Sequence, residues 1–465
     1  MGPDYKRPPV TEVPTFRGQS AAEAASLADL PWWEAFEDPV LKNLIQEALD
    51  SNYDVKIAAA RIQEARAQVG VARSQFFPQI GYNFAVARSR NPLAASGIPS
   101  NLTENTTTNF FLGALSAQWE LDIWGRIRRS NEAAQANLLA TEDARRGVWL
   151  TLVSDLAQAY FEMLALDVQV QIARDSAQAF QGTYDLFQDR LRFGLASQLQ
   201  TARAEGALGG AQANIPELEN RVVAKENQIS ILLGKAPAPI PRGTPMYGQP
   251  VVPTVPAGLP STLLQRRPDL RQVEQQLVRA NAQVGVAKAE FFPKLNLTSI
   301  LGTASPEIAA VTSGGSLVWA VAAALTGPIF QGGRILQNYR ATLAERDQAV
   351  LQYQQAVLTA LREVADSLTA LAKLRDAEAG QDRSVKALQE AVALATDRYR
   401  FGLASYYEVL EAQQQLFPAQ QTLAQIRRDR LTAYVALYKA LGGGWQLSDS
   451  QWTAQNELAG KEQTK

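Results

Sequence analysis

A large internal duplication constrains the fold of this chain more than any other feature of its sequence. Residues 67–80 (AQVGVARSQFFPQI) recur almost unchanged at residues 282–295 (AQVGVAKAEFFPKL). Residues 189–197 (DRLRFGLAS) recur at residues 397–405 (DRYRFGLAS), at a spacing seven residues shorter. Two copies of one large unit therefore fill most of the 465 residues. Two copies indicate a duplication rather than a solenoid.

The repeats divide the chain into five predicted segments. An extended N-terminal arm covers residues 1–38, and the first repeat follows over residues 39–234. A linker over residues 235–260 contains eight of the 23 prolines, which disfavour helix and favour an extended path. The second repeat covers residues 261–443, and a C-terminal tail covers residues 444–465.

Two long stretches without proline predict two unusually long helices. One lies between Gly125 and Phe193, and its partner runs from Ile335 to Phe401. At about 1.5 Å per residue, such helices would be roughly 95–100 Å long. Apolar residues of the second helix recur every seven positions and predict a coiled-coil seam: Leu343, Val350, Val357, Val364 and Leu371.

Each long helix ends at an RFGLAS motif, and a second helix begins directly after it. Gly194 and Gly402 suit the left-handed position that ends a helix. We therefore expect two long antiparallel helical hairpins, about 126–234 and 334–442. A capping box is predicted at the start of each returning helix, formed by Ser197 with Gln200 and by Ser405 with Glu408.

Each FFP motif ends a shorter predicted helix, because proline disfavours helix in the residue before it. These helices are expected at roughly 39–73 and 268–290. Alternation with a period of two then predicts four strands, two within about 78–122 and two within about 293–329. In the first strand, apolar residues share one face (Ile80, Tyr82, Phe84 and Val86).

Strands of ten or more residues with an apolar and a polar face are typical of outer-membrane barrels. A soluble sandwich with one buried face would show the same alternation, so both interpretations stay open at this point. If the strands lie in lipid, four strands cannot close a barrel, and lipid does not tolerate an open edge. The barrel must then be shared between chains. A dimer would leave little lumen, so three or four chains are favoured.

Composition excludes several classes of function. The net charge of −1 argues against nucleic-acid binding. The chain has no histidine and no cysteine, which removes most zinc and copper sites and the usual nucleophilic triads. An enzyme would need a site made of carboxylates alone, and no carboxylate pair stands out. We therefore expect no catalytic residues, no metal and no cofactor.

Several motifs together resemble the TolC/OprM-like outer membrane factors. They include GPDYKRP at the start, PWWEAFEDPVLKNLIQEAL, both FFP segments, RRPDLRQVEQQL, both RFGLAS motifs and ALYKALGGGW near the end. RRPDLRQVEQQL, the RFGLAS motifs and ALYKALGGGW favour the lipoprotein drug-efflux (NodT-type) branch. The resemblance implies a mixed α and β membrane protein, a homotrimer with a twelve-stranded β-barrel, four strands per chain. That barrel would be continuous with a long α-helical barrel.

The resemblance also implies a function. The protein would be a passive outer-membrane exit duct of a tripartite, RND-type multidrug efflux pump, extending into the periplasm of a Gram-negative bacterium. Its partners would be a periplasmic adaptor, an inner-membrane RND transporter and outer-membrane lipid. The lipidated cysteine and signal peptide of this branch are expected upstream of Met1. The outer-membrane channel of a type I protein secretion system is the alternative within the family, and a coiled-coil scaffold is the alternative outside it.

In this family the helical tips close the channel. Matching by motif carries the acidic ring onto Glu408 and Glu411, the hydrophobic constriction onto Tyr407, and a helix-tying tyrosine onto Tyr399. The equivalents in the first copy are Leu199, Gln200 and Arg203. Glu408 has a second explanation, because a carboxylate three residues after a capping serine also stabilises a helix start.

The adaptor would dock on the two tip turns. The first turn comprises Arg192, Phe193, Gly194, Leu195, Ala196 and Ser197. The second comprises Arg400, Phe401, Gly402, Leu403, Ala404 and Ser405. Some members carry a basic residue where Ala404 stands, so the clamp that this residue makes is not expected here.

Overall fold

The computed structural model describes residues 1–10, 13–17, 27–90, 107–249, 258, 260–312 and 314–444. Parts of the predicted arm and linker, and the tail beyond Gly444, lie outside these residues. The chain forms two compact units, and each draws on both repeats. The sheet unit comprises Met1–Pro8, Arg61–Thr141 and Gln272–Tyr353. The tip unit comprises Pro9–Ala60, Glu142–Arg271 and Gln354–Lys465.

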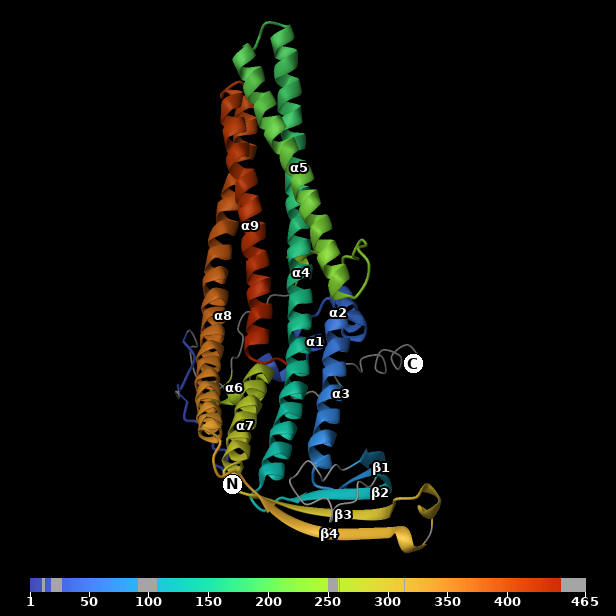
Figure 1. Ribbon diagram of the computed structural model, residues 1–465. Coiled ribbons are helices and arrows are strands. Elements are labelled where there is room, and N and C mark those ends of the chain that lie inside the picture. The colour runs from blue at the N-terminus through green and yellow to red at the C-terminus, as the bar shows by residue number, and fades with distance from the viewer. Residues whose placement is uncertain are drawn as a thin grey trace, which may run out of the picture. The chain divides into compact units, whose positions relative to one another are not determined.

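The sheet unit contains one four-stranded antiparallel sheet in the order β1-β2-β3-β4 (Figure 1). The strands are β1 (Gln79–Arg90), β2 (Thr107–Leu121), β3 (Lys294–Ser305) and β4 (Leu317–Thr326). The predicted pair of strands in each repeat is therefore confirmed. In addition, β2 pairs with β3, so the two repeats share one sheet. Within the described residues, β1 and β4 each pair on one side only.

The register brings the apolar faces of all four strands onto one side of the sheet. Tyr82 lies opposite Leu115, Leu115 opposite Leu301, and Leu301 opposite Trp319. Directly paired residues point to the same side of an antiparallel sheet. The side chains on this side are largely exposed in the single chain, Tyr82 by 77% and Trp319 by 72%. The sheet thus has an uncovered apolar face.

The opposite side of the sheet is polar. Gln79 lies opposite Gln118, Gln118 opposite Thr298, and Glu120 opposite Asn296. Two-sided alternation of this kind follows from the period-two pattern of the sequence.

Aromatic and charged contacts hold the sheet to the helices of the same unit. The Trp124 ring stacks on Phe292 at 4.8 Å between centroids, and its indole nitrogen donates to the Pro293 carbonyl at 2.8 Å. Arg126 begins α4 and donates twice to the Glu120 carboxylate, at 2.8 and 2.9 Å. These contacts fix the point where β2 passes into a helix.

Four long helices form two hairpins: α4 (Arg126–Arg192) with α5 (Gln198–Leu232), and α8 (Arg334–Arg400) with α9 (Tyr406–Ala440). Figure 1 shows each pair as adjacent antiparallel ribbons. Both α4 and α8 contain 67 residues, which corresponds to about 100 Å. The predicted hairpins are therefore confirmed. Within the described residues, none of these helices, or any other, combines the length and apolarity that crossing a membrane requires.

The predicted seam of α8 is only partly buried. Val357 and Val364 are buried as expected, whereas the other positions are half-buried. Tyr353 and Ala360 are almost completely buried instead. The four buried residues are spaced by four, three and four positions, which is the a/d spacing of a coiled-coil seam, so the seam is buried over this stretch of α8, which is only part of its predicted length.

The shorter helices are α1 (Trp32–Ala35), α2 (Pro39–Ser51), α3 (Tyr53–Ser74), α6 (Leu263–Arg266) and α7 (Pro268–Ala289). The prediction of a helix at 268–290 is confirmed, but one continuous helix over 39–73 is wrong. The helix breaks at Asn52, whose side-chain oxygen accepts from the backbone of Asp54 at 2.7 Å and Val55 at 3.2 Å. An Asn side chain that caps a following helix competes with continuation of the preceding one.

A buried carboxylate organises the tip unit near the start of α2. Asp38 is 2% exposed and caps α2 through the backbone N–H groups of Val40 and Leu41. It also accepts hydrogen bonds from the Tyr160 hydroxyl, the Thr244 backbone and the Gln249 amide, at 2.7 to 3.1 Å. The group therefore joins the arm, α4 and the linker.

Candidate functional site at the hairpin tips

Each hairpin ends in a glycine turn of the same geometry. Gly194 and Gly402 have φ values of 70° and 74°, a left-handed conformation that glycine adopts without a Cβ clash. The N–H of Leu195 donates to Arg190 at 2.7 Å, and that of Leu403 donates to Arg398 at 2.8 Å. These bonds satisfy helix-end carbonyls and close a Schellman motif. The predicted tip turns therefore lie where the sequence placed them.

Large apolar side chains project from both turns. Phe193, Leu195, Phe401 and Leu403 are between 69% and 80% exposed. Exposed apolar groups gathered at one end of a molecule are typical of protein interaction surfaces. The turns thus offer a candidate docking surface.

The first returning helix begins with the predicted capping box. The Ser197 hydroxyl accepts from the Gln200 backbone at 3.4 Å, and the Gln200 side chain accepts from the Ser197 N–H at 2.9 Å. Gln200 therefore has a local structural role besides the role that the sequence predicts for it.

The predicted capping box of the second returning helix is wrong. Ser405 occupies the N-cap position, but its side chain makes no capping hydrogen bond. The Glu408 carboxylate instead lies 3.6 Å from the Arg398 guanidinium. A nearby cation attracts the carboxylate more strongly than one backbone amide does. Both side chains are about half exposed, so the pair is screened by solvent.

Tyr399 lies among three helices. Its ring packs edge-to-face on Tyr406 of α9, with centroids 4.8 Å apart, and the Arg190 guanidinium of α4 lies 5.1 Å from its ring centroid. Its hydroxyl oxygen is buried without a hydrogen-bond partner among the described residues. Tyr399 therefore contacts both hairpins of its own chain.

Sequence reasoning missed Tyr406, a residue of α9 that contacts the first hairpin near the tips. Its hydroxyl lies 2.6 Å from Thr183 Oγ1 on α4, and its ring packs edge-to-face on Phe187. The Thr183 hydroxyl donates to the Ala179 carbonyl, so Tyr406 is the donor to Thr183. Burial raises the pKa of Tyr406 and keeps the hydroxyl protonated. The sequence does contain an indication that Tyr406 is buried, because Tyr406 lies on the same helix face as the apolar residue Leu410, which is buried.

The remaining predicted gate residues are exposed in the single chain. Tyr407 and Leu199 are 57% and 61% exposed, and Glu411 and Arg203 are exposed as well. The structure brings Glu408 and Tyr399 into contacts with other tip residues but leaves these four in solvent. Over the described residues, no three histidine, cysteine, aspartate or glutamate side chains gather closely enough to hold a metal ion.

Comparisons with known proteins agree across the whole chain. A family model described as outer membrane efflux protein matches residues 44–235 and 259–443. Cation efflux system protein CusC from Escherichia coli is 34% identical over 451 residues, 96% of each chain. The probable efflux pump outer membrane protein TtgC from Pseudomonas putida is 34% identical, covering 95% of this chain and 92% of its own.

Solved structures agree as well. The structure of the open state of the Neisseria gonorrhoeae MtrE outer membrane channel superposes with a TM-score of 0.86 at 29% identity. The match covers 96% of this chain and 98% of that one. The mixed helical and strand architecture is therefore that of known outer-membrane channels.

Proposed function

The chain belongs to the outer membrane efflux protein family, and from this premise we propose that it is the passive exit duct of a tripartite, RND-type multidrug efflux pump. It is a protein of the Gram-negative outer membrane that extends into the periplasm. In the proposal, the chain catalyses nothing and binds no cofactor. An inner-membrane RND transporter supplies the energy, and small molecules pass from the periplasm to the exterior.

One observation carries the proposal: a sheet with an uncovered apolar face, whose edge strands β1 and β4 pair on one side only among the described residues. Tyr82 on β1 and Trp319 on β4 are each more than 70% exposed, as lipid-facing side chains would be. Unpaired edges are not tolerated in hydrocarbon. Pairing β4 of one chain with β1 of the next removes every edge, and three chains give twelve strands. The polar side of the sheet then lines a water-filled lumen.

The long hairpins support the α-helical barrel of the proposal. At about 100 Å, α4 and α8 exceed what a globular domain needs. Twelve helices from three chains would enclose a tube continuous with the β-barrel.

We assign the gate to the helical tips. Three copies each of Glu408 and Glu411 around one axis would form acidic rings, with Tyr407 as an apolar collar and Tyr399 holding helices together. The exposure of Tyr407 and Glu411 in the single chain supports this assignment, because residues that face a shared axis have no partner within one chain. Leu199, Gln200 and Arg203 would line the same opening from the first hairpin.

The exposed apolar tip turns support docking of a periplasmic adaptor. Phe193 and Phe401 are about four-fifths exposed, which only a partner or crowding of the tips would cover. Relatives named for efflux of cations, toluene and solvents favour small cargo over the proteins that a type I secretion channel exports.

Covalent trapping of the shared barrel tests the proposal. The chain has no cysteine, so Gly81→Cys on β1 can be combined with Ala320→Cys, Ala322→Cys or Ala324→Cys on β4. Within one chain β1 and β4 are separated by two strands, about 14 Å, which is beyond disulfide reach. At one of the three registers, oxidation should yield covalent trimers that conduct ions in planar bilayers.

The matched control is Gly81→Cys with Ser116→Cys, which are directly paired and should crosslink within one chain. Monomers at every β1–β4 register, or trimers without conductance, would contradict the duct.

A further inference from the structure

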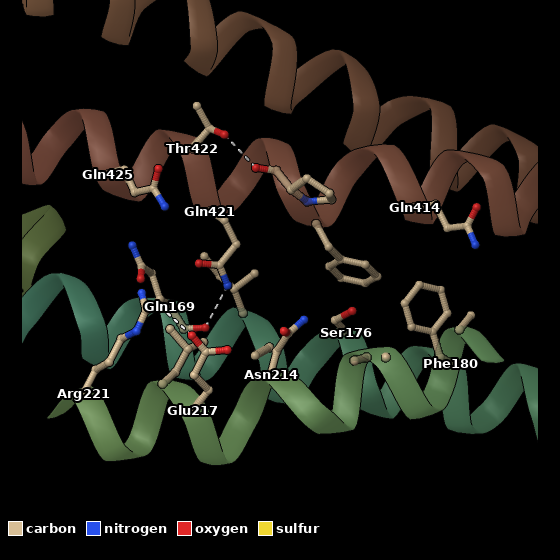
Figure 2. Close-up of a pocket in the computed structure, with 18 of the residues that line it drawn as sticks. Gln169, Ser176, Phe180, Asn214, Glu217, Arg221, Gln414, Gln421, Thr422 and Gln425 are labelled. Carbon is tan, nitrogen blue, oxygen red and sulfur yellow. Dashed lines mark hydrogen bonds and ion pairs between the residues drawn. The ribbon is translucent and has the colours of Figure 1, made fainter. Parts of the chain in front are cut away.

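A cavity of about 610 Å³ lies between α4, α5 and α9 in the tip unit (Figure 2). Cavities of about 300–1,000 Å³ hold drug-sized molecules. Because α4 and α5 form the first hairpin and α9 belongs to the second, an occupant would touch both hairpins. Neither the family match nor the proposed duct assigns a role to this cavity.

One part of the lining is aromatic and spacious. Phe180 of α4 and Phe417 of α9 pack edge-to-face with centroids 5.6 Å apart. On α5, Gly206 and Gly210 line the cavity. A Cβ atom added at either glycine would meet no atom within 4 Å. The missing side chains leave room for a flat ring beside the aromatic pair.

The Ser176 side chain is mostly buried, but its hydroxyl opens into the cavity (Figure 2). Ser176 is 7% exposed, lines the cavity and points into it in Figure 2. No other described residue accepts from or donates to its hydroxyl. By contrast, Ser154 and Thr183 donate to carbonyls four residues earlier, at 2.7 and 3.0 Å. A polar group of a molecule in the cavity could therefore donate to this hydroxyl or accept from it, in place of water.

The remaining polar residues of the lining favour a ligand that is polar but uncharged. Asn214 and Gln414 each present an amide that can donate and accept. The two charged groups of the lining, Glu217 and Arg221, neutralise each other through a 2.5 Å hydrogen bond. The net charge of the cavity wall is therefore zero.

We propose that this cavity binds an uncharged aromatic amphiphile, a flat ring that carries a hydroxyl or carbonyl group within reach of Ser176. The ring would pack against Phe180 and Phe417, and the polar group would take the hydrogen bonds that Ser176 and Asn214 leave open. Bound between α5 and α9, such a molecule would hold the two hairpins at their present separation. The binding claim stands independently of whether the assembled protein conducts.

The first test uses 1-naphthol as the probe and the whole 465-residue chain in detergent. Because the chain has no cysteine, Ser176→Cys carries a single thiol within the cavity. N-ethylmaleimide should alkylate the thiol of the Ser176→Cys variant. Saturating 1-naphthol should slow that reaction at least about fivefold. Gln212→Cys, on an exposed position of α5 outside the cavity, should react at the same rate with and without 1-naphthol.

The second test fills the cavity without unfolding the helix. Gly210→Leu places a side chain into the cavity, whereas Gly209→Leu places it one position away, outside the lining and with equal room. Leucine has a higher helix propensity than glycine, so both variants should fold. In equilibrium dialysis, Gly210→Leu should weaken 1-naphthol binding at least about tenfold, and Gly209→Leu should leave it unchanged.

Three results would overturn the proposal. One is equal binding by the two leucine variants. Another is equal slowing of alkylation at positions 176 and 212, which would indicate partition into detergent. The third is a thiol at position 176 that does not react even without 1-naphthol, because a second copy of the chain or the neighbouring helices would then fill the cavity.

Discussion

The Tyr406 hydroxyl donates to Thr183 Oγ1 across 2.6 Å and so hydrogen-bonds the second hairpin to the first, below the tips. One bond in this position couples the movement of α9 to that of α4. In the proposed gate, any outward swing of the second hairpin has to break it.

Removing this bond should loosen the tips. Tyr406→Phe keeps the ring on Phe187 and deletes only the hydroxyl, so we expect a loss of about 0.5–1.5 kcal/mol of stability. Single-channel recordings should show more frequent or longer openings. Tyr53→Phe is the matched control, since Tyr53 lies outside the proposed gate and its exposed hydroxyl makes no hydrogen bond among the described residues. Equal effects of the two substitutions would exclude the coupling.

A double-mutant cycle should isolate the same bond. Thr183→Val removes the acceptor and leaves the buried hydroxyl of Tyr406 unpaired, which should cost more than Tyr406→Phe. The double variant should then be no worse than Thr183→Val alone, because the cost of the unpaired hydroxyl disappears. Thermal unfolding in detergent measures the stability lost in each variant. If the loss in the double variant equals the sum of the losses in the two single variants, a direct interaction is contradicted.

Charge neutralisation at the tips should change selectivity. Replacing Glu408 and Glu411 with Gln removes the proposed acidic rings, so cation preference and block by multivalent cations should both fall. Reversal potentials in a salt gradient measure the change. Since Glu408 also pairs with Arg398, Arg398→Gln separates the effects: it removes the local pair and leaves the ring charges. Unchanged selectivity in the double Gln variant would refute the rings and leave the duct intact.

Asp38 should be among the least replaceable residues of the tip unit. Its carboxylate is buried and accepts from Tyr160, Thr244 and Gln249 besides capping α2. Asp38→Ala leaves the Tyr160 hydroxyl and the Thr244 N–H without their acceptor and removes the cap of α2, which should cost at least about 3 kcal/mol. Asp376→Asn, on an exposed ion pair, should cost less than about 1 kcal/mol. Comparable melting temperatures for the two variants would contradict the role of Asp38.

Acid should abolish the contribution of Asp269 to the stability of the folded protein. Burial raises the pKa of this carboxylate, but two hydrogen bonds and the charge of Arg267 outweigh burial and hold the pKa below its ordinary value of 3.8. A depressed folded-state pKa stabilises the protein above the unfolded-state pKa, and the gain is lost as pH falls through the folded-state pKa. Asp269→Asn should therefore be destabilising at pH 7 by at most about 1 kcal/mol, since the side chain is half exposed. The difference should vanish in strong acid, and its persistence there would contradict the ion pair.

Local sequence patterns were sufficient to predict the long helices, the strands and the turns between helices. The absence of proline predicted α4 and α8, and the period of two predicted the apolar face that runs from Tyr82 to Trp319. Glycine at 194 and 402 located both turns. These features depend on the backbone and on nearest neighbours along the chain, which a sequence records directly.

Features that depend on contacts between distant segments were not predictable in the same way. Tyr406 meets Thr183 from 223 positions away; helical periodicity indicates that Tyr406 is buried, but it does not identify Thr183 as the partner. Glu408 turns to Arg398 rather than to the capping position, because two local interactions compete. The side chain of Asn52 caps α3 and so ends the preceding helix. The periodicity of apolar residues continues across this break and therefore did not predict it.

Pairing of β2 with β3 has a consequence for how the chain reaches its final state. Phe111 lies opposite Ser305, so the central ladder of the sheet cannot form until the second repeat has emerged. Until then the first β-hairpin carries unpaired edges and a row of apolar side chains, Tyr82 and Phe84 among them, which is a template for non-native association. Because the β2–β3 pairing joins segments that are far apart in the sequence, we expect this sheet to form slowly. If the first repeat reaches the membrane before the second, a chaperone would be needed to cover that hairpin.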